Sequence, residues 1–162
     1  MARLQEGRWT HAHDGGIVVF LIGMRVNRPW RPDLWVPTFT AMPRMLAELQ
    51  REPVRGLLGA QLLLGSGGPS LVQHWRSTDE LYAYAADPAG EHRPAWTAFN
   101  RRARAARGAV GIWHETYAVP AGGLESIYVD MPVSGLAAAT GAVPVTAGSQ
   151  TARQRLAGPT RL

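Results

Sequence analysis

The chain has 162 residues, of which 46% are hydrophobic and 18% charged, so it fits one folded domain and not a disordered chain. It contains no cysteine and no lysine, which excludes disulfides, thiolate nucleophiles and Schiff-base chemistry. The net charge of +5 arises from dispersed arginines without a zinc-finger or helix-turn-helix signature, so we expect no nucleic-acid partner.

The hydropathy pattern gives no sign of a membrane partner. The longest apolar run, Gly16 to Met24, has half the length that a bilayer-spanning helix needs. The first residues lack the apolar core of a secretion signal. We therefore expect a cytoplasmic protein.

The first half of the chain begins with a polar segment, residues 1–15, which predicts a short strand or loop. Apolar side chains on both faces of Ile17 to Val26 predict a central strand. From Asp33 to about Arg51, apolar residues recur at helical spacing. Pro37 and Pro43 interrupt this segment, so we expect a kinked helix or two short ones.

The second half alternates strands and helices. In chain order it predicts strands over Val54–Leu64 and Ser70–Trp75, a helix from about Ser77 to Ala86, a helix from about Glu91 to Arg107, and strands over Val110–Val119 and Leu124–Val129.

The order of these elements predicts an α+β fold of the ferredoxin-like β-α-β-β-α-β type, an antiparallel sheet with helices on one face. We expect a single domain over residues 1–136. Residues 137–162 are rich in Ala, Gly and Pro and predict a mobile tail. Since the tail leaves the second sheet face uncovered, we expect a homodimer that packs two sheets face to face.

A polar stripe is predicted on the second long helix. His92, Trp96 and Asn100 are spaced i, i+4 and i+8, so they share one side of the helix. Facing the sheet, they would place an imidazole, an indole and an amide along a cavity. In the alternative interpretation Trp96 packs in the core with Phe99, while His92 and Asn100 only satisfy neighbouring backbone groups.

The strand V110-GIWHETY-117 carries an unusual set of polar and aromatic side chains. Strand alternation places Trp113, Glu115 and Tyr117 on one face and His114 on the other. We expect the first set to face the cavity and His114 to lie near the dimer interface.

A buried Glu115 would need a cationic partner, for which Arg25 and Arg76 are candidates. Such an ion pair would either take part in catalysis or only stabilise the contact between strands. Trp75 is a candidate substrate contact or a core residue. His11 and His13 alone, without a third ligand, do not make a metal site, and we expect none.

Several segments together resemble one family; they are GRWT at 7–10, VVFLIGMRVNRPW at 18–30, MPRMLAEL at 42–49, VQHWRS at 72–77, EHRPAWTAFNRR at 91–102, VGIWHETY at 110–117 and YVDMP at 128–132. The chain resembles a family named for a fungal polyketide monooxygenase, within the antibiotic-biosynthesis-monooxygenase-like proteins of the dimeric α+β barrel superfamily. This resemblance implies a homodimer with a pocket between helices and sheet.

The resemblance also implies a reaction. Enzymes of the wider group oxidise aromatic or polyene substrates with O₂ and no added cofactor, so the first hypothesis is a cofactor-independent monooxygenase acting on an aromatic or polyketide-like metabolite. His92 would be the base, and Trp96 and Asn100 would position the substrate. The further candidates are Glu115 and His114 for catalysis and Phe20, Arg25, Trp75, Trp113 and Tyr117 for substrate contact.

Two alternatives remain. The superfamily also contains haem monooxygenases and haem-containing aldoxime dehydratases, and a haem b would take His92 as its axial ligand. The third hypothesis is a non-catalytic dimer that binds a small molecule.

Overall fold

The computed structural model describes residues 3–65, 67–105 and 108–157. Four antiparallel strands form its main sheet in the order β3-β4-β2-β5. These strands are β2 (Ile17–Val26), β3 (Leu57–Gly65), β4 (Gly68–Trp75) and β5 (Val110–Val119). Apolar β-branched and aromatic residues fill the central strand β2, which is hydrogen-bonded on both sides.

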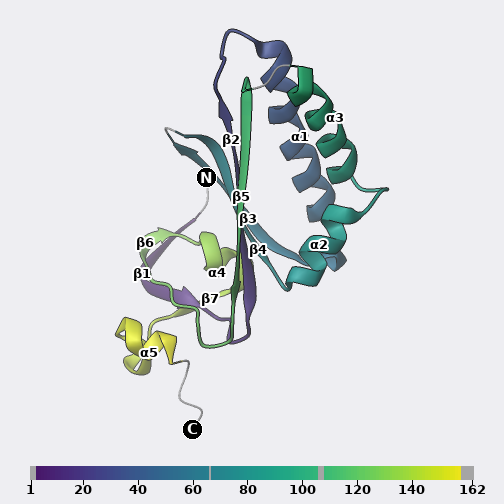
Figure 1. Ribbon diagram of the computed structural model, residues 1–162. Coiled ribbons are helices and arrows are strands. Elements are labelled where there is room, and N and C mark those ends of the chain that lie inside the picture. Colours follow the sequence, from purple (N-terminus) through teal and green to yellow (C-terminus); the bar gives the residue numbers. More distant parts are fainter. Residues whose placement is uncertain (1–2, 66, 106–107, 158–162) are drawn as a thin grey trace.

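Three helices cover one face of this sheet (Figure 1). They are α1 (Pro32–Arg51), α2 (Thr78–Ala86) and α3 (His92–Ala105). Elements β2 to β5 follow the order β-α-β-β-α-α-β, in which α2 and α3 together take the place of the second helix, and the predicted ferredoxin-like α+β fold is confirmed. The described part of α3 ends at residue 105, and the predicted end at Arg107 lies outside the described residues.

Helix α1 is continuous in spite of its two internal prolines. It begins with Pro32 at its first position, where a missing N–H costs nothing. Pro37 and Pro43 each remove one backbone hydrogen bond, yet helical structure persists from residue 32 to residue 51. The alternative of two separate helices is therefore wrong.

The opposite face of the main sheet is partly covered by this same chain. A small sheet places β1 (Leu4–His11) between β6 (Tyr128–Pro132) and β7 (Ala142–Pro144). Next to it, α4 (Gly135–Thr140) packs on β3 (Figure 1). The last elements are a 3₁₀ turn over Ala147–Ser149 and α5 (Ala152–Leu156); another 3₁₀ turn, Pro53–Arg55, precedes β3.

The segment expected to be a mobile tail thus carries regular structure up to residue 156. Small residues make this possible. Ala137 on α4 is almost completely buried, and Ala139 lies so close to Gly59 that a Cβ at residue 59 would stand 2.8 Å from its methyl group. Close packing of Ala on Gly buries little area per residue, which explains why a search for large apolar side chains overlooks it. The last predicted strand also shifts, from 124–129 to 128–132.

The tightly packed core occupies only one end of the space between helices and sheet. It consists of Val18, Leu49, Trp75, Leu81 and Tyr84. Trp75 is 1% exposed, so its indole ring is packed on all sides. Its N–H donates to the Gln73 side-chain carbonyl at 2.9 Å, so the buried polar atom has a hydrogen-bond partner.

No helix among the described residues combines the length and the hydropathy that crossing a membrane would require.

Candidate active-site cavity

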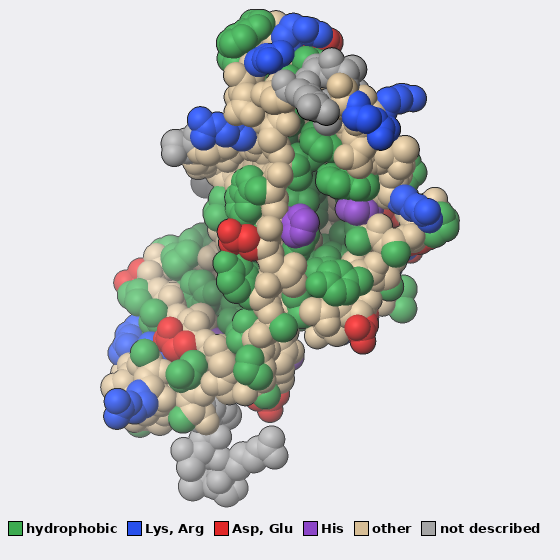
Figure 2. Space-filling view, in the orientation of Figure 1, with side chains coloured by type: hydrophobic (Ala, Val, Ile, Leu, Met, Phe, Trp, Pro, Cys, Tyr) green, Lys and Arg blue, Asp and Glu red, His purple; other side chains and the backbone are tan. Residues whose placement is uncertain are grey.

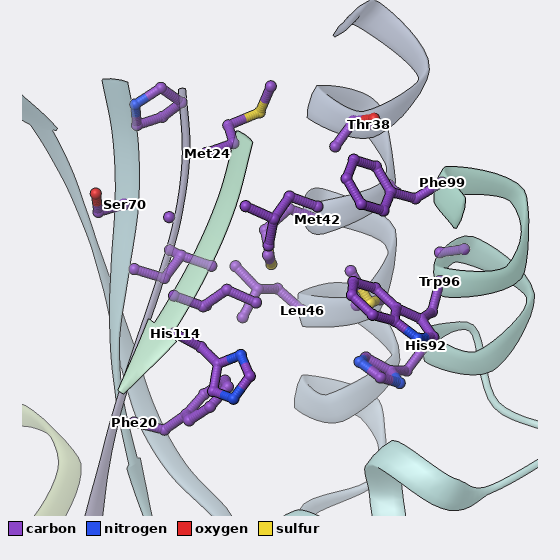
Figure 3. A pocket seen from close by; sticks show the side chains of 18 of the residues that line it. Phe20, Met24, Thr38, Met42, Leu46, Ser70, His92, Trp96, Phe99 and His114 are labelled. Carbon is purple, nitrogen blue, oxygen red and sulfur yellow. The ribbon is translucent and has the colours of Figure 1, made fainter. Parts of the chain in front are cut away.

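A cavity of about 500 Å³ occupies the other end of the space between helices and sheet. Its walls come from all four strands of the main sheet on one side and from α1, α2 and α3 on the other (Figure 3). The volume lies within the range of pockets that hold small molecules. Figure 2 shows that the surface is hollowed between β5 and α3, with a histidine side chain on each side of the hollow.

His92 stands at the first position of α3 and lines the cavity. Its Nδ1 lies 3.0 Å from the carbonyl oxygen of Ala85, near the end of α2. A carbonyl can only accept, so Nδ1 carries the hydrogen, and in the neutral ring Nε2 keeps the free lone pair. The ring also packs near Tyr84, with centroids 6.1 Å apart. The two neighbours hold an imidazole at the cavity wall with one nitrogen available as a base.

His114 also lines the cavity, and the predicted orientation of β5 is wrong. Ile112, His114 and Thr116 are the β5 residues in the cavity wall. The register explains the orientation, because Ile22 pairs with His114 and Phe20 pairs with Thr116 on the helix-facing side of the sheet. The Phe20 ring, predicted as a substrate contact, also lines the cavity and lies 5.6 Å from that of His114. His92 and His114 therefore face the same space (Figure 3).

Trp113, Glu115 and Tyr117 consequently lie on the outer face of the sheet, away from the cavity. All three are exposed, and the Tyr117 hydroxyl donates to the Glu115 carboxylate at 2.7 Å. This bond raises the pKa of the Tyr117 phenol, since the carboxylate holds its proton. Alternation shows which residues share a face, but it does not show which face meets the helices.

The predicted ion pairs of Glu115 do not form. Arg25 pairs with Gly111 in the sheet while Glu115 pairs with Leu21, so four residues, about 13 Å, separate the two along β2. Arg76 instead binds Glu80 on α2, at 2.6 Å, and donates to the Val54 carbonyl. Arg25 is exposed and does not line the cavity.

The stripe predicted on α3 reaches the cavity with two of its three residues. Trp96 lines the wall and stacks on Phe99, with centroids 5.5 Å apart. Asn100 is half-buried but is not part of the wall; Phe99 takes that position. A helix turns 100° per residue, so a spacing of eight residues drifts by 80° from the starting direction, enough to turn Asn100 away. Trp75, in the packed core, does not line the cavity either.

The prediction missed the wall that α1 contributes. Thr38, Met42 and Leu46 follow each other at helical spacing along this wall, which is completed from β2 by Met24 (Figure 3). The same spacing was a signal for a buried helix face, and it cannot distinguish a filled interior from a hollow one.

The cavity is strongly apolar. Among its described lining residues there is no Arg, Asp or Glu; polar side chains in its wall belong to His92, His114, Thr38, Tyr82 and Thr116. No cluster of three or more metal-ligating side chains occurs in the described ranges. In such surroundings a few polar atoms orient a ligand, and their interactions are stronger than they would be in water.

An ion network next to the packed core fixes the helices that carry the cavity. Arg55 binds Glu52 at 2.6 Å and Asp87 at 2.7 Å, and its guanidinium lies over the Tyr84 ring. The Tyr84 hydroxyl donates to Glu48 of α1 at 2.8 Å, and burial together with this bond raises its pKa. The network ties the end of α1 to the end of α2, directly before His92.

The sequence was compared with those of known proteins. Residues 17–136 match the monooxygenase af470-like family. Monooxygenase af470 from Aspergillus fumigatus is 29% identical over 134 residues, an alignment that covers 75% of this chain and 46% of that protein. The chain thus spans about half the length of the curated relative it matches.

Solved structures with a similar fold include two described as oxygenases. SnoaB, a cofactor-independent oxygenase from Streptomyces nogalater, is 18% identical, with 63% of this chain and 91% of that chain covered and a TM-score of 0.40. A putative antibiotic biosynthesis monooxygenase from Caulobacter crescentus is 16% identical, with 64% and 91% covered and a TM-score of 0.44. The resemblance stated from the sequence segments is confirmed by the family match, and the chain belongs to the monooxygenase af470-like family.

Proposed function

We propose that this chain oxidises an aromatic or polyketide-like metabolite with O₂ in the cavity between helices and sheet, with His92 as the base. The observation that carries the proposal is the hydrogen bond from His92 Nδ1 to the Ala85 carbonyl, which leaves Nε2 as the free lone pair at an apolar wall. Membership of a monooxygenase family supports the reaction class.

The chemistry balances without an added reductant when the substrate supplies all the electrons. Removal of a proton from a phenol or enol gives an electron-rich anion that can reduce O₂. A ring methylene activated in this way gives up four electrons, according to R₂CH₂ + O₂ → R₂C=O + H₂O. His92 Nε2 takes the first proton and returns it to the departing water. The apolar walls surround the anion with few polar groups that could compete for it.

The other residues of the cavity would position the substrate. Trp96 and Phe20 present flat rings on opposite walls, which suits a planar ligand between them. His114 stands opposite to His92 and would donate a hydrogen bond to the oxygen from which His92 removes the proton (Figure 3). The predicted role of His114 in catalysis is thus retained, on the cavity side of the sheet. Asn100, Glu115, Arg25, Trp75, Trp113 and Tyr117 have no part in this proposal.

The test is O₂ uptake by the purified protein with a panel of phenols, anthrones and quinols. His92→Gln should lower kcat about 10²- to 10⁴-fold, the usual contribution of a general base. His13→Ala, which changes a histidine outside the cavity, is the matched control and should leave the rate unchanged. Full activity of His92→Gln would remove the base from the proposal. No uptake by the native protein with any substrate would favour the non-catalytic binding alternative.

A haem group fits the lining of this cavity less well than a neutral aromatic substrate does. His92 Nε2 could bind iron, but the described lining residues include no arginine to pair with the two propionates of haem. We therefore base no step of the reaction on it. Titration with haemin would test this judgement: a Soret band that is lost in His92→Gln would restore the haem hypothesis.

We also propose that the chain forms a homodimer through the uncovered part of the outer sheet face. Trp113, Tyr117 and Leu63 are 40%, 50% and 45% exposed there, although apolar side chains of this size gain from burial. Light scattering should give twice the monomer mass, and Trp113→Glu should shift it towards that of a monomer. A monomeric native protein at high micromolar concentration would contradict this proposal.

A further inference from the structure

Glu48 joins three helices through one side chain. It lies in the last turn of α1, and its side chain is 13% exposed. Its Oε2 accepts from the hydroxyl of Tyr84 on α2 at 2.8 Å and from the backbone N–H of Glu91, the residue before α3, at 3.1 Å. The Arg55 guanidinium lies 3.8 Å from Oε1, so the carboxylate has a cationic neighbour. A single oxygen atom therefore holds both α2 and the beginning of α3.

The contact at Glu91 supplies what the first turn of α3 lacks. The Glu91 carbonyl accepts from the Ala95 N–H at 3.3 Å, so Glu91 is the N-cap residue of this helix. In a capping box, the side chain three positions after the N-cap residue accepts from the N–H of that residue. Here this position is Pro94, whose side chain has no acceptor. Glu48 provides the acceptor from another helix, and the dipole of α3 favours its negative charge.

The same oxygen controls the surroundings of His92, the first residue of α3. The imidazole packs near the Tyr84 ring, and its Nδ1 lies 3.0 Å from the Ala85 carbonyl oxygen. Both contacts come from consecutive residues of α2, while the backbone of His92 directly follows Glu91. Because Glu48 Oε2 binds Tyr84 and Glu91, it fixes the imidazole relative to the carbonyl to which the imidazole donates.

We propose that Glu48 is a positioning residue for His92. Its carboxylate keeps the Nδ1 hydrogen of His92 on the Ala85 carbonyl and thereby directs the free lone pair of Nε2 into the cavity. Glu48 is not among the described residues that line the cavity, and it takes no part in proton transfer. The inference rests on the proposed function only in taking His92 as the base.

The test follows the tautomer of His92 by long-range ¹H–¹⁵N NMR of the labelled protein without substrate, at about pH 9, where free imidazole is neutral. The signals of His92 are identified by their absence from His92→Gln. In the native protein we expect the hydrogen on Nδ1 alone. Glu48→Met keeps the length of the side chain and removes both hydrogen bonds. The two nitrogen signals should then move towards the averaged positions of a free imidazole, which exchanges between both tautomers.

Two variants separate the geometry of Glu48 from its charge. In Glu48→Gln the charge is lost, but both hydrogen bonds meet on one oxygen, so the amide carbonyl accepts both and the native tautomer should be kept. Glu52→Gln is the matched control. In the described part of the chain the Glu52 carboxylate binds only Arg55, at 2.6 Å, so this variant weakens the same ion network and should also keep the native tautomer.

The rate of O₂ uptake gives a second measurement with the same variants. Glu48→Met should lower kcat about tenfold, because a displaced base loses its alignment with the substrate, and it should change KM by less than about twofold. Glu48→Gln should restore the native kcat. Equal losses of kcat in Glu48→Met and Glu48→Gln would assign the effect to charge and contradict the positioning role.

Thermal melting shows whether each variant is folded. A folded Glu48→Met protein with the native tautomer of His92 would overturn the inference, because Glu48 would then only stabilise the fold. Where Glu48→Met alone does not fold, its combination with Tyr84→Phe removes the hydroxyl together with its acceptor, and this double variant should show the same release of the imidazole. The NMR measurement uses neither O₂ uptake nor substrate, so failure of the proposed oxidation would leave its result intact.

Discussion

The space between helices and sheet is filled at one end and hollow at the other, although the same layers enclose both. At the filled end Trp75 reaches from β4 into a cluster with Leu49 and Tyr84. At the hollow end the walls are equally apolar, but the side chains leave about 500 Å³ between them. The difference is one of volume and not of hydrophobicity, so we assign stability to the filled end and keep ligand binding at the hollow end as a proposal.

The largest effect is expected when a large side chain is removed from the filled end. Trp75→Ala removes a fully buried indole and leaves Gln73 without its donor. It should lower the free energy of unfolding by about 3–5 kcal/mol, as measured by urea denaturation. Trp96→Ala at the hollow end is the matched control and should cost far less, since that side chain is 47% exposed. Equal costs would show that the hollow end contributes to the core.

The reverse experiment fills the hollow end. Ala95 lies in the cavity wall on α3, and Ala95→Phe should occupy space reserved for the ligand. Binding of apolar probes should fall at least tenfold, while the free energy of unfolding changes by less than about 1 kcal/mol because the void absorbs the ring. Leu49→Phe makes the same kind of enlargement in the packed core, at a residue that does not line the cavity, and it should instead destabilise by about 1–3 kcal/mol.

A smaller effect is expected from pH. His74 is buried on the outer face of the filled end, and burial lowers its pKa below the usual 6.5. The unfolded chain then binds more protons than the folded one, so His74 stabilises the fold above about pH 6.5 and this contribution is lost as the pH falls towards its folded pKa. The urea concentration at the midpoint of unfolding should decrease as the pH is lowered from 7.5 to 5.

His74→Gln should flatten this profile without abolishing it. His11 also has a lowered pKa, caused mainly by burial and then by His13, and it retains its part of the dependence. An unchanged profile in His74→Gln would assign the dependence to other groups.

The smallest effect is expected on the exposed outer face. Tyr117→Phe removes the hydrogen bond to Glu115, but both groups are in contact with water, which replaces the lost partner. At a dilution where light scattering gives the monomer mass, the melting temperature should therefore not change measurably. A clear decrease at a concentration where the protein is dimeric would mean that this face is buried there, and it would provide independent support for the dimer.

The sequence predicted the sheet better than it predicted the site. The ends of β2 and β5 agree with the prediction to the residue, because apolar β-branched runs bounded by glycine and proline are strong signals. His92 and Trp96 were placed on one stripe of a helix, and both line the cavity.

The remaining errors share a physical origin. The face of β5 depends on tertiary packing against Phe20 and Ile22, which alternation within a single strand does not contain. The structure of α4 depends on Ala–Gly contacts between distant segments, which no local pattern reveals.

Gly23 gives the hollow end one more property. It lines the cavity on one side, and on the other a Cβ in its place would lie 2.5 Å from the Trp113 indole nitrogen. At this position only the backbone of Gly23 separates the cavity from the proposed dimer surface. A shift of the backbone caused by a ligand would therefore reach Trp113 directly, because no side chain lies between them. If a bound ligand changes the association constant of the dimer by some factor, dimer formation changes the affinity for the ligand by the same factor. Concentration of the protein thus becomes a variable in every binding measurement.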